Sequence, residues 1–71
     1  MQRFGEKLRT LRHQNSLTLR GLAVKLGMSH HSQLGNIEVG RRKPSAELVF
    51  KIARFFNVLA DQLMDDELEL D

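Results

Sequence analysis

The sequence predicts an all-α fold, a compact five-helix bundle in one small domain. Apolar residues recur at spacings of three and four along most of the 71 residues, and no window shows the strict alternation of a half-buried strand. A chain of this length buries only a thin core. Because it contains no cysteine, disulfides and thiolate zinc sites are excluded, and we expect packing alone to hold the fold.

The first helix is expected from about Gln2 to Gln14, where the turn-prone pair Asn15-Ser16 follows. Thr18 is a suitable N-cap for a second helix, and Gly27 is a suitable C-terminal stop. The inward sides of these two helices are indicated by the helical spacing of Phe4, Leu8, Leu11, Leu22, Ala23 and Leu26.

A third helix is expected roughly from His31 to Val39, and Gly40 ends it. Either Ser29 or His30 can cap its start, and the sequence leaves both open. The inward side of this helix is indicated by Leu34 and Ile37.

Two further helices are expected after Pro44, which separates them from the third. Ser45 is a suitable N-cap for the fourth helix. A short fifth helix is expected to close the bundle with Leu63 and Met64. The inward side of the fourth helix is formed by Val49, Ile52, Ala53 and Phe56.

Charge is distributed unevenly along the chain. All eleven Lys and Arg lie before residue 55, and five of the nine acids lie in residues 65–71. Residues 1–64 carry 11 basic and 4 acidic side chains, a balance of +7, which favours a polyanionic partner. The acidic end has three interpretations: a frayed, solubilising tail, which is the default; a segment whose leucines engage another chain; or a competitor of DNA for the basic face.

The outward side of the third helix carries side chains suited to reading base edges. An α-helix fits the major groove, where amides and hydroxyls match base donors and acceptors. The candidate base-reading residues are His31, Ser32, Gln33 and Asn36. The candidate phosphate-binding residues are Arg20, Arg41, Arg42 and Lys43. The plain alternative is that the polar side of this helix is merely solvated.

Several short motifs together resemble the phage-repressor and Cro-type helix-turn-helix family, often called Xre-like, over about Phe4 to Met64. The motifs are Leu-Arg-x-Leu-Arg (8–12), Leu-Thr (17–18), Leu-Ala (22–23), Leu-Gly-x-Ser (26–29), Ile-Glu-x-Gly (37–40) and Lys-Pro-Ser (43–45). The resemblance implies a DNA-binding domain over residues 1–64, before the acidic tail 65–71. It also implies that the third helix enters the major groove of a palindromic operator as part of a dimer. It further implies that Arg12 pairs with Glu38.

The chain departs from the family pattern at several positions. Leu19 stands where the family commonly has a phosphate-binding glutamine, a role that Arg20 can take. Gly35 lies mid-helix, at a cost of up to about 1 kcal/mol relative to alanine, and either permits close approach to DNA or reflects relaxed requirements there. Leu59 replaces the serine that usually caps the last helix, so we expect a loosely defined start there.

Other site classes are not indicated. The adjacent histidines His30 and His31 diverge by about 100° on a helix, which disfavours shared metal binding, and we expect no metal site and no cofactor. No nucleophile elbow or activated pair suggests an enzyme. We expect no membrane association and a cytoplasmic protein. A homodimer interface is predicted at Phe50, Phe55 and Leu59, although Phe50 can instead pack under the last helix.

These observations favour a sequence-specific transcriptional regulator that binds double-stranded DNA, and a repressor in particular. A different class, a protein-interaction module such as an antitoxin that binds a toxin or another partner through the fourth helix and the tail, is the main alternative. A controller protein of a restriction system is a third possibility.

Overall fold

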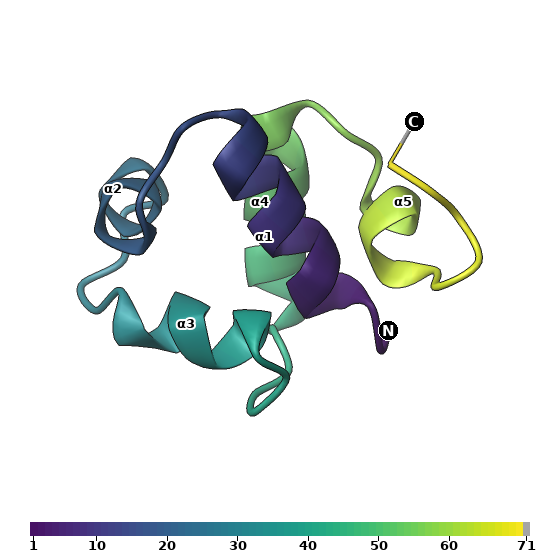
Figure 1. Ribbon diagram of the computed structural model, residues 1–71, viewed down its shortest axis with the longest axis horizontal. Helices are drawn as coiled ribbons and strands as arrows, with labels where there is room; N and C mark the ends of the chain where they lie inside the picture. The colour runs from purple at the N-terminus through teal and green to yellow at the C-terminus, as the bar shows by residue number, and fades with distance from the viewer. Residues whose placement is uncertain (71) are drawn as a thin grey trace.

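The computed structural model describes residues 1–70 and confirms the all-α prediction. Within that range five helices follow one another without a strand: α1 (Phe4–Gln14), α2 (Leu19–Lys25), α3 (Ser32–Glu38), α4 (Ala46–Phe56) and α5 (Ala60–Met64). Figure 1 shows α1 and α4 at the centre of the molecule, with α2, α3 and α5 arranged around them. Helix α1 contacts both α3 and α5, so it connects the two sides of the bundle.

A single apolar core joins all five helices. Most residues predicted to face inward are buried, but Phe56 is only partly buried and Met64 is 41% exposed. Met64 therefore does not close the bundle as predicted, and Leu63 alone fills that place on α5. The buried apolar residues are Phe4, Leu8, Leu11, Leu22, Ala23, Leu26, Leu34, Ile37, Val49, Ile52, Ala53 and Leu63.

Two of the predicted N-caps are confirmed. The hydroxyl of Thr18 accepts a hydrogen bond from the Gly21 amide at 2.9 Å, and that of Ser45 accepts from the Leu48 amide at 3.1 Å. Both residues have an extended backbone, which directs the hydroxyl back at the first helical turn. Gly27 (φ +72°) and Gly40 (φ +82°) end α2 and α3 in the left-handed conformation that glycine adopts without strain.

The start of α3 differs from both sequence-based alternatives. Neither Ser29 nor His30 caps it; the N-cap position falls on His31, which makes no side-chain cap hydrogen bond. The backbone of His31 is already helical (φ −69°, ψ −19°), so it lacks the extended geometry that a capping side chain needs. Helix α3 thus spans Ser32–Glu38, one residue shorter at each end than predicted.

The first and last helices also begin in ways that the sequence did not indicate. Helix α1 starts at Phe4 rather than near Gln2, and the amides of Gln2 and Arg3, which precede it, donate to the Asp66 carboxylate. Helix α5 has a defined start, since the Gln62 side chain accepts from the Leu59 amide at 2.9 Å. Leu59 has no oxygen to complete a reciprocal capping box.

Residues 65–70 fold back against the bundle (Figure 1). Leu70 is partly buried and packs on the core. The default expectation of a frayed tail is therefore wrong for these residues, because backbone carbonyls and carboxylates of the segment are held by α1 and the residues before it.

Candidate nucleic-acid interface

Helices α2 and α3 form a helix-turn-helix unit. After Gly27 the amide of Met28 donates to the carbonyl of Ala23 at 2.8 Å, which closes the last turn of α2 and redirects the chain. Leu22 and Ala23 on α2 and Leu34 and Ile37 on α3 are buried, so these two helices share the core. Their opposite sides remain accessible.

The side of α3 predicted to read bases lies outward. His31, Ser32 and Gln33 are exposed and Asn36 is half-buried. Val39, one turn further on, is 64% exposed. Within residues 1–70 no hydrogen bond occupies the side chains of these predicted readers, so their donors and acceptors are available to a ligand.

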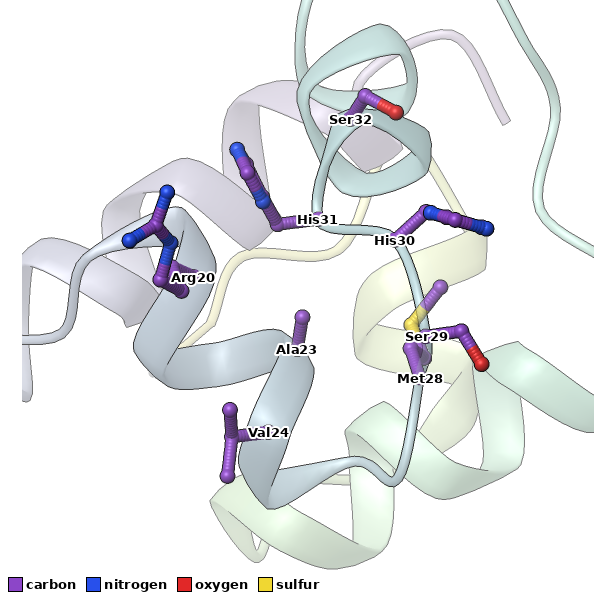
Figure 2. A pocket seen from close by; sticks show the side chains of 8 residues that line it. All are labelled: Arg20, Ala23, Val24, Met28, Ser29, His30, His31 and Ser32. Carbon is purple, nitrogen blue, oxygen red and sulfur yellow. The ribbon is translucent and has the colours of Figure 1, made fainter.

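An open groove separates α2 from the start of α3. It has a volume of about 360 Å³ and is lined on one side by Arg20 and on the other by the turn that contains His30 and His31. Figure 2 shows the side chains of Arg20 and His31 extending in the same direction, whereas His30 points away from them. No carboxylate lines this groove, so it is suited to an anion.

The cationic corner, defined as Arg41, Arg42 and Lys43, directly follows α3. Its backbone is tied to the helix, because the Arg41 amide donates to the Asn36 carbonyl at 2.8 Å. All three side chains are exposed and none forms an ion pair with the described part of the chain. Arg42 and Lys43 line a groove of about 190 Å³ together with Gln33, which brings predicted phosphate-binding and base-reading side chains to one surface.

The C-terminal end of α3 is fixed by an ion pair with α1. The Arg12 guanidinium donates from Nε and Nη2 to the two carboxylate oxygens of Glu38, at 2.7 and 3.0 Å. The side chains are only 11% and 5% exposed. A third hydrogen bond joins Arg12 to the Leu17 carbonyl at 2.8 Å. The hydrogen bond that Arg12 donates to Glu38 raises the pKa of Arg12. Because both side chains are largely buried and already paired with each other, this pair is structural and is not available for DNA.

Sequence reasoning missed a second attachment at the same end. The Cα of Gly5 on α1 lies so near α3 that a Cβ there would overlap the carbonyl of Ile37 and lie 2.6 Å from that of Glu38. A glycine in the first helical turn, where it costs helix stability, was the available signal. Glycine is required here because the backbones of α1 and α3 are in contact.

Leu19 and Gly35, two departures from the family pattern, lie next to each other in the structure. Leu19 is partly buried against the core, and a Cβ at Gly35 would meet its Cδ1 at 3.5 Å, an ordinary contact. Close packing within the protein therefore does not require a glycine at position 35. Leu19 contributes apolar packing between α2 and α3.

The residues predicted for a dimer interface are exposed: Phe50 by 57%, Phe55 by 40% and Leu59 by 69%. The alternative that Phe50 packs under α5 is therefore wrong. Phe50 and Phe55 are five residues apart on α4 and so point about 140° away from each other. Phe55 lies on the α2 side, beside Lys25 and Leu26, and meets Phe56 edge to face at 4.9 Å.

No helix in residues 1–70 has both the length and the apolar character needed to cross a bilayer.

Comparisons with known proteins agree with this geometry. The family model described as a helix-turn-helix domain matches residues 3–66. An uncharacterized HTH-type transcriptional regulator of Methanocaldococcus jannaschii is 42% identical over 64 residues, covering 86% of this chain and 96% of the relative. The uncharacterized HTH-type transcriptional regulator YazB of Bacillus subtilis is 39% identical over 64 residues, covering 90% of this chain and 91% of its own length.

Proposed function

Because the chain belongs to the helix-turn-helix domain family, we propose that it is a sequence-specific transcriptional repressor that inserts α3 into the major groove of a palindromic operator as a homodimer. Its general class, a DNA-binding transcription regulator rather than an enzyme, follows from the family and from relatives named as HTH-type transcriptional regulators. It acts in the cytoplasm and represses by covering a promoter.

The observation that carries this proposal is the shared surface of α3 and the cationic corner. Gln33 from the outward side of α3 and Arg42 and Lys43 from the corner line one groove. Contacts to phosphates fix the register of a reading helix, and contacts to base edges provide specificity. A duplex against this surface meets both kinds of side chain at once.

Each predicted residue takes a distinct role in this proposal. Gln33 and Asn36 read adenine through their amides, while His31 and Ser32 reach bases or the adjoining backbone. Arg20 neutralises a phosphate from the α2 side of the groove shown in Figure 2. The remaining phosphate contacts come from Arg41, Arg42 and Lys43.

The dimer in this proposal uses the apolar surface near the end of α4. Phe55 and Leu59 lie at its C-terminal end and at the start of α5, while Phe50 lies on a separate flank. Substituting Phe55 and Leu59 with Ser is expected to leave a monomer in sedimentation, whereas Phe50→Ser alone tests the separate flank. If neither change alters the mass on operator DNA, the dimer is formed elsewhere or not at all.

Selection of bound fragments from random DNA tests the proposed function directly. A palindrome whose half-sites are about one helical turn apart is expected from a helix-turn-helix dimer. On that site Asn36→Ala or Gln33→Ala should cost about 1–3 kcal/mol and relax preference at one base position. Replacing Arg42 should weaken binding to every sequence. It should also reduce by about one the magnitude of the slope of log binding constant against log salt concentration. Retention of no sequence at low salt would exclude the proposal.

The exposed apolar residues of α4 also support a second candidate, a protein-interaction module of the antitoxin type. In that case Phe50 or Phe55 contacts a toxin or another protein instead of a second copy. Residues 65–70 do not favour this candidate, since the segment is already engaged by α1. This candidate would be supported if Phe50→Ser abolished a complex with the other protein while the variant still bound DNA.

A further inference from the structure

Lys7 is a buried cation on α1 with an unusual set of partners. It is 2% exposed, and its Nζ donates to the backbone carbonyls of Gln62, Asp65 and Leu68 at 2.7, 2.8 and 2.6 Å. An ammonium has three donors, and all three are used. Because every partner belongs to the end of α5 or to the segment after it, Lys7 holds the backbone of that segment against α1.

Carboxylates of the same segment are attached at a second place. Asp66 accepts from the amides of Arg3 and Gln2, both at 2.8 Å, and Glu69 accepts two hydrogen bonds from Arg3 at 2.9 and 3.1 Å. The backbone hydrogen bonds from Arg3 and Gln2 lower the pKa of Asp66 to about 2. Asp66 is therefore charged at neutral pH, and this attachment weakens only as the pH falls from about 4 towards 2.

Residues that hold the attached segment share a groove with the cationic corner. Met1 and Gln2, next to Asp66, line a groove of about 460 Å³ that Arg42 and Lys43 also line. A released segment of six residues can extend about 20 Å. The reach of each carboxylate grows with its distance from Met64, so in a molecule of 30 × 23 × 20 Å Glu69, near the free end, has a longer reach towards the corner than Asp65 or Asp66.

We propose that Lys7 is a positioning residue for DNA binding: by holding residues 65–70 on α1, it keeps their carboxylates from occupying the phosphate-binding corner. This inference rests on the proposed function, because the corner is assigned to phosphates there. Without the Lys7 ammonium, the three carbonyls lose their donor, and the hydrogen bonds of Asp66 and Glu69 to Gln2 and Arg3 are left to hold the segment, so it detaches more readily. Its carboxylates then compete with phosphates for Arg42 and Lys43.

The test compares Lys7→Met with Arg9→Met, a control that removes an exposed cation from the same helix. At low salt Lys7→Met should weaken DNA binding about fivefold more than the control, the scale expected when exposed ion pairs compete with phosphate contacts. Ending the Lys7→Met chain after Met64 should restore the affinity. The same restoration is expected when all five acids after Met64 are replaced by their amides, namely Asp65, Asp66, Glu67, Glu69 and Asp71.

The inference is overturned if Lys7→Met binds DNA as the control does, or if neither removal of the segment nor its neutralisation restores binding. Circular dichroism spectra and thermal midpoints show whether each variant is folded. A variant that loses DNA binding because it is unfolded should not regain affinity when the carboxylates of the segment are neutralised.

A second measurement requires no DNA and so distinguishes failure of this inference from failure of the proposed function. The chain has no cysteine, which allows a single spin label at Glu67→Cys. In Lys7→Met the label should broaden the amide resonances of Arg42 and Lys43 more strongly than it does in the parent chain. Equal broadening in both proteins would show that loss of Lys7 does not bring the segment to the corner.

Discussion

The two ends of α3 are held very differently. At the C-terminal end Glu38 pairs with Arg12 at 2.7 Å, the carbonyl of Glu38 lies against Gly5, and Gly40 closes the last turn. At the N-terminal end His31 provides no side-chain cap, and an open groove separates the helix from Arg20. One end is thus fixed by α1, and the other depends on its backbone and on the buried Leu34.

This difference indicates how a seven-residue helix can be both positioned and adaptable. Because a helix this short has little stability of its own, its position is determined by tertiary contacts. Those contacts gather where the chain leaves α3 for the cationic corner. The predicted readers His31 and Ser32 lie at the less restrained end, where small adjustments against a duplex disturb few internal contacts.

Breaking the Arg12–Glu38 pair should produce the largest effect. Arg12→Met leaves the Glu38 carboxylate, 5% exposed, without its partner, and we expect a loss of about 3 kcal/mol in unfolding free energy. This is a large part of the stability of so small a domain. Urea denaturation measures it. The double variant Arg12→Met, Glu38→Met should be less destabilised than Arg12→Met alone, and an equal or greater loss would contradict the pairing argument.

Filling the contact between α1 and α3 should come next. In Gly5→Ala the added Cβ meets backbone carbonyls of Ile37 and Glu38 that cannot rotate away, and overpacking of this kind costs about 2 kcal/mol. Gly35→Ala is the matched control. There the new Cβ has only an ordinary contact with Leu19, and the helix should gain up to about 1 kcal/mol. Similar urea midpoints for the two variants would show that the backbones are not in close contact.

The difference between local contacts and contacts across the fold explains how much of the molecule was predictable from its sequence. The helices and the caps at Thr18 and Ser45 depend on neighbours within one turn, and local patterns predict them. Contacts across the fold have no such signature. The approach of Gly5 to α3 and the burial of Lys7 depend on segments more than thirty and fifty residues away along the chain. The outward side of α3 was predictable because two buried residues fix its orientation, but its uncapped start was not.

A pH titration of DNA binding probes the open end. Histidine changes charge between about pH 5 and 8, and a phosphate near His31 favours the charged form. Arg20 is the charged group facing His31 across the groove. Because a charged imidazole contacts a phosphate more strongly than a neutral one, affinity should rise about threefold to fivefold from pH 8 to pH 6.

The control for this titration is the variant His30→Gln, His31→Gln, which retains the exposed His13 on α1. Its affinity should vary little over the same pH range. If the affinity of the variant changed with pH as much as that of the parent chain, another group would cause the pH dependence and the two histidines would not contact DNA.

The smallest effect is expected from the serine that precedes α3. Ser29→Ala should change the unfolding free energy by less than about 0.5 kcal/mol, because Ser29 is exposed and the N-cap position falls two residues later, on His31. Ser45→Ala is the control, since its hydroxyl accepts from the Leu48 amide at 3.1 Å and losing such a cap costs about 1 kcal/mol. Thermal midpoints of the two variants compare a capped helix with an uncapped one. If Ser29→Ala lost as much as Ser45→Ala, α3 would be capped in solution and both of its ends would be restrained.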